Sequence, residues 1–416
     1  MNPTMCLRAL NKDVFARLVT APLSRTSLQQ MYAMERQTPA SSLMLSLFCR
    51  DVTEAPEKEK FLAPMEFLHS ELPKRLCQEI KLLNTRLPFE PMDPQVNAKI
   101  QNITLDLLED ISALTSLAVP AEPQHLARFA SALRVLQSRQ LQSLTSLRDC
   151  LNHMMSEQKR RCNRDQAFIR EQMDHFLTNY LSLNYGTGFL IGQSLHQLDG
   201  FQPVINEISP HAAAEQAIER ARYWCSQYYC CDSPKVELIT KNPDLSVLAA
   251  DNYLPDSLFQ VMKHSISSVI EHSKATGASP RSMPTLQVRI TEGKEDVCFR
   301  VSDLGGGIPM SKVGNIWSHL NNSLLHPEKI RGLPMTRIIS RYFGGDLEIV
   351  SMEGHGTESY LYLDKKGNLG ECVPMVRTTE REMESLMNKV FPQLPREEAV
   401  PVYSNDTPSE RVAVTA

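Results

Sequence analysis

The sequence of 416 residues lacks several features that would place it quickly in a class. It has no run of 18 apolar residues, so we expect no membrane-spanning helix. Its ten cysteines show no CxxC spacing, which argues against a structural zinc site and a disulfide framework. It has no basic surplus, since 44 basic residues face 48 acidic ones, and this balance disfavours a nucleic-acid-binding protein.

Glycine is absent from the first 185 residues, where apolar side chains recur at helical spacing. Ile103, Leu107 and Ile111 are one such series. Prolines, Pro64 among them, are expected to separate helices rather than interrupt them. Residues 26–200 therefore predict a four-helix bundle.

Alternation of apolar and polar residues, typical of half-buried strands, marks the second half of the chain. It occurs at 286–290, 297–301, 347–350 and 360–363. Helical spacing lies between these strands, at 255–273 and about 333–343. The predicted fold class is α+β, in which the bundle precedes an α/β sandwich over 205–366, a mixed sheet with helices on one face.

The two ends differ from the middle. Residues 1–25 are acid-poor and amphipathic, with Arg8, Lys12 and Arg17, which is typical of a mitochondrial transit peptide; an ordinary frayed first helix is the alternative. Residues 367–416 are charged and contain proline, and we expect a tail that is partly helical at its start.

The strongest local motif is an aspartate at a strand end, Asp303, followed by the glycines at 305–307. The carboxylate can accept a hydrogen bond from an exocyclic amine such as that of adenine, and glycines let the backbone approach a ligand closely. A second block, Gly332-Leu333-Pro334, has the composition of a helix start that cradles phosphate. A third block, ending in Gly356-Thr357, precedes a strand.

These three blocks in this order resemble the GHKL ATP-binding fold of DNA gyrase and histidine kinases. The chain is most similar to the mitochondrial protein kinases, pyruvate dehydrogenase kinase and branched-chain α-ketoacid dehydrogenase kinase, over residues 21–365. In the bundle half, FLHSELPKRL at 67–76 matches a block of that family, and Tyr253-Leu254-Pro255 matches the start of its nucleotide-box helix. The resemblance implies bound ATP and transfer of its γ-phosphoryl group to a serine on a decarboxylase subunit.

The same resemblance places the catalytic groups on the helix at 255–273, four residues apart. Where the family has histidine, a glutamate base and a magnesium-binding asparagine, this chain has Gln260, His264 and Ser268. An imidazole can serve as a general base, but glutamine cannot ionise to assist it. A serine hydroxyl is too short to replace the amide as a Mg²⁺ ligand without a bridging water. We expect His264 and Gln260 to be degenerate catalytic positions and Ser268 a degenerate metal position.

Other replacements fall at the phosphate end of the site. Gln140 replaces the histidine that follows Arg139, Ile330 replaces a glycine before Gly332, and Glu271 lies where the family has a basic residue. The nucleotide-binding residues Asp303, Gly305, Gly307, Gly332, Leu333 and Thr357 are kept. The adenine end is therefore predicted to be intact, while the magnesium and phosphate end is not.

Three interpretations follow. The chain is a pseudokinase that regulates or docks, an active serine kinase that uses His264 as its base, or an ATPase or nucleotide sensor. The resemblance further implies the mitochondrial matrix, a lipoyl domain and a decarboxylase subunit of a 2-oxoacid dehydrogenase complex as partners, and a homodimer or a heterodimer with a related kinase. Trp317, the last tryptophan, is expected to pack rather than to stack on a ligand.

Overall fold

The computed structural model describes residues 57–87, 94–120, 122–161, 166–201, 204–277, 282–322 and 332–365, with a few residues between 374 and 385. The predicted transit peptide, most of the predicted tail and Ile330 lie outside these ranges. No helix in the described part is long and apolar enough to cross a membrane.

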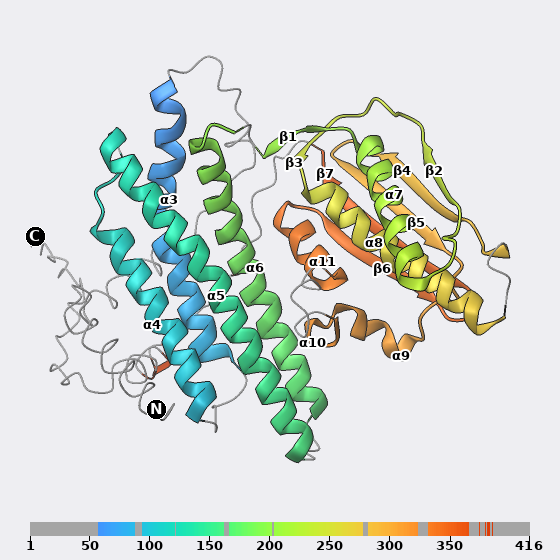
Figure 1. Cartoon of the computed structure of the whole chain (residues 1–416), viewed down its shortest axis with the longest axis horizontal. Coiled ribbons are helices and arrows are strands. Elements are labelled where there is room, and N and C mark those ends of the chain that lie inside the picture. The colour runs from blue at the N-terminus through green and yellow to red at the C-terminus, as the bar shows by residue number, and fades with distance from the viewer. Residues whose placement is uncertain are drawn as a thin grey trace, which may run out of the picture.

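Four long helices lie side by side in the first half (Figure 1), which confirms the predicted bundle. They are α3 (Glu57–Lys81), α4 (Pro94–Ser116), α5 (Pro123–Arg161) and α6 (Gln166–Leu198), and α3 continues into a π-helical turn, η2 (Leu82–Arg86). Their facing sides bury leucine, isoleucine and phenylalanine side chains in one core.

The prediction that Pro64 separates two helices is wrong. Both Pro64 and Pro73 lie inside α3. A proline in a helix removes one backbone hydrogen bond at a cost of about 3 kcal/mol. Burial of the α3 neighbours Met65, Leu68 and Leu72 outweighs this cost, because packing of the apolar face supplies most of a helix's stability.

The second half contains the predicted mixed sheet, which confirms the α+β fold. Its strand order is β2 (Val236–Thr240), β4 (Leu286–Glu292), β5 (Asp296–Asp303), β7 (Gly356–Asp364) and β6 (Asp346–Met352). The β2–β4 pair is parallel and the other three pairs are antiparallel. The helices α7 (Pro210–Tyr229), α8 (Tyr253–Ala275) and α11 (Leu333–Tyr342) cover one face of this sheet (Figure 1).

Sequence reasoning missed α7, the edge strand β2 of the large sheet, and the two-stranded sheet formed by β1 (Ile205–Ile208) and β3 (Val247–Ala250). The signal for α7 was present. Ser209 caps it by accepting a hydrogen bond from the backbone N–H of Ala212 at 3.3 Å, and Pro210 follows in the first turn. Its buried face consists of alanines, which carry little hydrophobic signal.

The bundle and the sheet half meet at an aromatic cluster. Tyr185 and Phe189 of α6 contact Tyr342 and Phe343 at the end of α11 with ring centroids 5.1–6.4 Å apart. A Cβ on Gly186 would lie 2.7 Å from the Tyr342 ring. The first glycine of the chain therefore stands where the two halves pack most closely.

A candidate nucleotide site

The catalytic stripe of α8, defined as Gln260, His264 and Ser268, has the predicted register. The apolar residues of the opposite stripe, among them Met262 and Ile266, are fully buried. The four-residue spacing places the three polar side chains on one side of the helix. Ser268 reaches the glycine turn after β5, where its Oγ donates to the Gly305 carbonyl at 3.3 Å.

Asp303 ends β5 and is only 2 % exposed. Its Oδ1 accepts a hydrogen bond from the Gly305 N–H at 2.9 Å, while Oδ2 has no partner among the described residues. Burial raises the pKa of this carboxyl, and the Gly305 N–H opposes that shift. The Ser265 hydroxyl also favours the ionised form, although it makes no hydrogen bond of ordinary geometry with Asp303. Oδ2 is thus a buried acceptor that an amino group of a ligand could satisfy.

Thr357 lies directly beside Asp303, because β5 and β7 pair antiparallel in that register. Its hydroxyl lies 2.9 Å from the Ser351 hydroxyl of β6. A Cβ on the preceding Gly356 would lie 2.0 Å from the Asp303 carbonyl oxygen. The third predicted block is therefore in place beside the first.

The glycine turn at 305–307 is required by the protein's own packing. A Cβ on Gly305 would lie 2.6 Å from the Ser268 Oγ of α8. Gly307 has φ +68°, and its Cβ would lie 1.9 Å from the Met352 carbonyl oxygen. Sequence reasoning assigned these glycines to close approach of a ligand, whereas here they admit α8 and the end of β6.

Gly332 and Leu333 form the start of α11 as the sequence predicts. Gly332 is the N-cap, and its carbonyl accepts a hydrogen bond from the Thr336 N–H at 3.0 Å. Leu333 is buried and Pro334 follows in the first turn. The first N–H groups of this helix supply the positive end of its dipole, which suits a phosphate.

Gln260 and His264, the two predicted catalytic positions, make no hydrogen bond to each other among the described residues. Gln260 Oε1 accepts a hydrogen bond from Lys263 Nζ at 2.8 Å, and His264 Nδ1 is buried without a hydrogen-bond partner among the described residues. Burial lowers the pKa of His264, opposed by the charges of Asp303 and Glu271. The lowered pKa keeps the imidazole neutral at neutral pH, and no hydrogen bond from the described residues to Nδ1 fixes its tautomer as a base requires.

Ser268, the predicted metal position, donates its hydroxyl hydrogen to the Gly305 carbonyl and keeps the lone pairs of its oxygen. The described residues contain no group of three or more His, Cys, Asp or Glu side chains that could hold a metal ion. Glu271 accepts a 2.5 Å hydrogen bond from the Tyr229 hydroxyl of α7, raising the pKa of that tyrosine, with burial, to about 12. This acid therefore points toward α7, away from the glycine turn.

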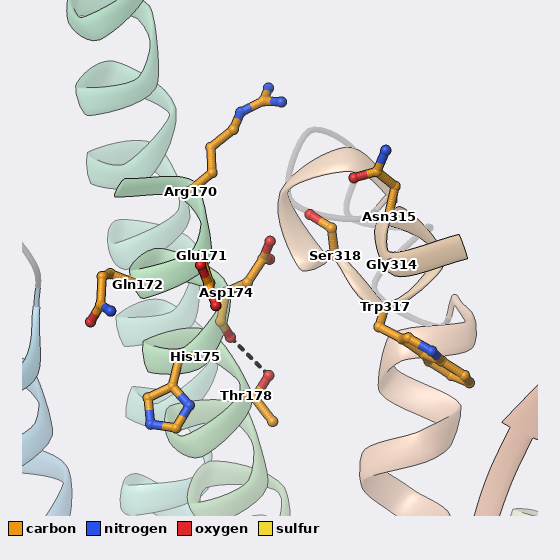
Figure 2. Close-up of a pocket in the computed structure, with 10 residues that line it drawn as sticks. All are labelled: Arg170, Glu171, Gln172, Asp174, His175, Thr178, Gly314, Asn315, Trp317 and Ser318. Carbon is orange, nitrogen blue, oxygen red and sulfur yellow. Dashed lines mark hydrogen bonds between the residues drawn. The ribbon is translucent and has the colours of Figure 1, made fainter. Parts of the chain in front are cut away.

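A cavity of about 1010 Å³ lies between α6 and the segment after the glycine turn (Figure 2). That segment comprises α9 (Met310–Val313), η4 (Gly314–Trp317) and α10 (His319–Asn322). Asp174 of α6 accepts hydrogen bonds from the first N–H groups of α10, at 2.8 Å from His319 and 3.4 Å from Leu320. The predicted nucleotide-binding residues are not among those that line this cavity.

Trp317 lies at the edge of the cavity, and its ring packs against the Arg337 guanidinium of α11 at 4.3 Å. Arg337 in turn pairs with Asp346 at 3.2 Å. Sequence reasoning missed both Asp174 and Lys263 as functional candidates. The contact of Asp174 with His319 depends on the fold, whereas that of Lys263 with Gln260 spans three residues of one helix, a spacing that the sequence shows.

Comparisons with known proteins agree with this geometry. Residues 25–214 match the family model described as mitochondrial branched-chain alpha-ketoacid dehydrogenase kinase, and residues 253–367 match the histidine kinase-, DNA gyrase B- and HSP90-like ATPase. The second match implies an ATP-binding domain.

Named relatives are mitochondrial pyruvate dehydrogenase kinases. One from Arabidopsis thaliana is 28 % identical, over 77 % of this chain and 89 % of its own length. One from Drosophila melanogaster is 26 % identical, over 87 % and 91 %. Human isozyme 3 is 28 % identical, over 80 % and 84 %. Over most of its length the chain is therefore similar to the mitochondrial protein kinases that include the pyruvate dehydrogenase and branched-chain α-ketoacid dehydrogenase kinases, and its second half matches the ATP-binding domain of the GHKL superfamily.

Proposed function

We propose that this protein is a nucleotide-binding pseudokinase that regulates a 2-oxoacid dehydrogenase complex in the mitochondrial matrix. The observation that carries the proposal is the contrast inside one site. Asp303 presents a buried, unsatisfied acceptor oxygen, while His264 has no orienting partner and Ser268 is engaged by Gly305. These residues therefore support nucleotide binding at Asp303 but do not support phosphoryl transfer at His264 and Ser268.

Asp303 would hold the adenine end of ATP by accepting a hydrogen bond from the exocyclic amino group at Oδ2. Thr357 lies next to it, and the backbone of Gly305 and Gly307 would border the base. The helix start at Gly332 would face the phosphates. ATP when bound supplies a transferable phosphoryl group, but the side chains that would activate an acceptor hydroxyl are absent or unoriented.

The direct test is thermal melting of the full chain with ATP, with and without Mg²⁺. A ligand at 100 times its Kd stabilises by about 2.7 kcal/mol, which raises Tm by several degrees. We expect ATP to raise Tm equally with and without Mg²⁺. It should not raise Tm in the Asp303→Asn variant, because the side-chain NH₂ of asparagine would place a donor opposite the donor amino group of adenine. A shift that requires Mg²⁺ would contradict the pseudokinase proposal, and no shift would contradict nucleotide binding.

An active serine kinase is the second candidate, and the lowered pKa of His264 favours it because a neutral imidazole can accept a proton. The test is transfer of ³²P from labelled ATP to the decarboxylase subunit. Under the pseudokinase proposal, transfer is absent and His264→Ala changes nothing. Under the kinase alternative, transfer is present and His264→Ala lowers its rate 10²-fold or more.

The assembly is proposed from the family. We propose that 26–200 and 205–366 act as bundle and kinase domains, that the bundle contacts a lipoyl domain, and that two chains, identical or related, form a dimer. Sedimentation of the purified chain, alone and mixed with a related kinase, distinguishes these assemblies. A monomer under both conditions would contradict the dimer.

A further inference from the structure

An aromatic surface with no role in the nucleotide site lies on α7. Tyr223 is 71 % exposed, Tyr228 65 % and Trp224 39 %. Such side chains are normally buried, and contiguous exposed ones mark interaction sites. Figure 1 shows α7 in the layer outside the sheet, beside α8. Tyrosine and tryptophan are also the residues that carry most binding energy in protein interfaces.

Cations alternate with the rings along this surface. Arg220 lies over the Phe259 ring at 5.0 Å, and Lys263 lies between Phe259 at 5.6 Å and Trp224 at 5.2 Å. Trp224 stacks on Tyr228, with centroids 4.9 Å apart and planes at 10°.

The series continues through Tyr229, which meets Tyr228 edge to face at 4.9 Å and lies under Lys274 at 5.0 Å. We call the series from Arg220 to Lys274 the cation–aromatic ladder. Its side chains hold one another in place, so a partner pays little entropy to order them.

The ladder touches the catalytic stripe at one point. Lys263 donates from Nζ to Gln260 Oε1 at 2.8 Å while it contacts both rings. Gln260 and His264 mark where a substrate hydroxyl would have to lie in an active member of the family. A partner seated on the ladder therefore lies next to that position, as a decarboxylase subunit would and a lipoyl domain on the bundle would not.

The charge of the ladder selects an acidic partner. It contains three cations, Arg220, Lys263 and Lys274. Among the described residues, two acids contact members of the ladder: Asp256 pairs with Arg220 at 2.9 Å, and Glu271 accepts from the Tyr229 hydroxyl. Three cations against these two acids leave a surplus of one positive charge. Complementary charge would both steer and orient a carboxylate-bearing segment.

We propose that the cation–aromatic ladder docks an acidic segment of the decarboxylase subunit, holding it beside the degenerate catalytic stripe. This proposal rests on the proposed function, because it takes its partner from there. The docking needs no phosphoryl transfer, so it gives a pseudokinase a way to occupy the subunit's phosphorylation region.

The test is surface plasmon resonance of the full chain against purified decarboxylase subunit. We expect the double variant Trp224→Ala with Tyr228→Ala to weaken binding about 100-fold. Trp224→Phe with Tyr228→Phe keeps the rings and should bind within a few-fold of the wild type. Phe168→Ala, at a residue of α6 that is 63 % exposed, is the matched control and should bind normally. Raising salt from 50 to 200 mM should weaken wild-type binding, because salt screens the attraction between the ladder cations and an acidic partner.

The outcomes separate the two proposals. Wild-type binding that the double alanine variant retains would overturn the ladder proposal and leave the proposed function standing. No wild-type binding to the decarboxylase subunit would overturn the ladder proposal, whereas the proposed function is judged separately by the ATP-induced melting shift. Self-association in sedimentation that the double variant abolishes would identify a second copy as the occupant, and binding to vesicles of anionic lipid would identify a membrane; either result would overturn the ladder proposal.

Discussion

The two ends of the nucleotide site differ in how tightly the protein specifies them. At the adenine end, strand pairing fixes Asp303 and Thr357, and the glycines pack so closely that a Cβ on Gly305, Gly307 or Gly356 would lie under 3 Å from a neighbouring atom. At the catalytic stripe, Nδ1 of His264 lacks a hydrogen-bond partner among the described residues, and Gln260 accepts a hydrogen bond from Lys263 of the ladder. The contrast indicates that a fold can keep the residues that shape a binding site while the side chains at the predicted catalytic positions are replaced.

The largest effect is expected from Gly307→Ala. This residue combines φ +68° with a Cβ position 1.9 Å from the Met352 carbonyl oxygen, so we expect a loss of about 4 kcal/mol in unfolding free energy and no ATP binding. Gly354→Ala is the matched control, since φ is +80° there but nothing lies within 4 Å. It should cost about 1 kcal/mol. Chemical denaturation measures both, and equal losses would refute the role of the clash.

A buried acid in the bundle provides a contrast to Asp303. Glu79 is 1 % exposed, its Oε1 has no partner among the described residues, and burial with the charge of Asp110 raises its pKa to about 8. Asp110 itself is held by Arg139 at 2.6 Å. Both Glu79 and Asp303 carry an unsatisfied oxygen, but ligand binding is expected to satisfy only that of Asp303.

The sign of the Glu79 effect follows from linkage. Because the pKa of Glu79 is raised in the folded state, the folded protein holds this proton more tightly than the unfolded chain does. The contribution of Glu79 to the unfolding free energy is therefore complete below about pH 4.5 and is lost as pH rises toward 8. Glu79→Gln should be more stable than the wild type at pH 8.5 by roughly 4 kcal/mol and equal to it near pH 4.5. Melting curves across this range measure the difference. ATP should leave it unchanged, and a pH-independent difference would be inconsistent with the raised pKa.

Much of this fold could be predicted from the sequence, because four strands of the large sheet alternate apolar and polar residues and α8 carries an apolar stripe, whereas β2 does not alternate and was missed. The buried alanine face of α7 gave no comparable signal, and Pro64 misled because local propensity was weaker than packing. Asp303 and Thr357 were predicted to share a site, and strand register brings them together. The pairing of Ser268 with Gly305 could not be predicted, since side-chain choices among neighbours depend on three-dimensional distances.

Restoring the family's residues on the catalytic stripe tests whether only that end has failed. The triple variant Gln260→His, His264→Glu and Ser268→Asn should gain Mg²⁺-dependent phosphoryl transfer to the decarboxylase subunit, about 10²-fold above the wild type. The double variant without Gln260→His should gain less, because its glutamate has no orienting histidine. No gain in either, with ATP binding intact, would locate the defect in the segment after the glycine turn as well.

The smallest effect concerns the charges around His264. Burial is the main cause of its lowered pKa, but Lys263 lowers it further while Asp303 and Glu271 raise it. Lys263→Met should therefore raise the pKa of His264, and Glu271→Gln should lower it. NMR titration of the imidazole protons measures both. Shifts of opposite sign would place His264 between the ladder cation and the α7-facing acid. Shifts of the same sign would mean that repacking around His264, and not the neighbouring charges, determines how its pKa changes in these variants.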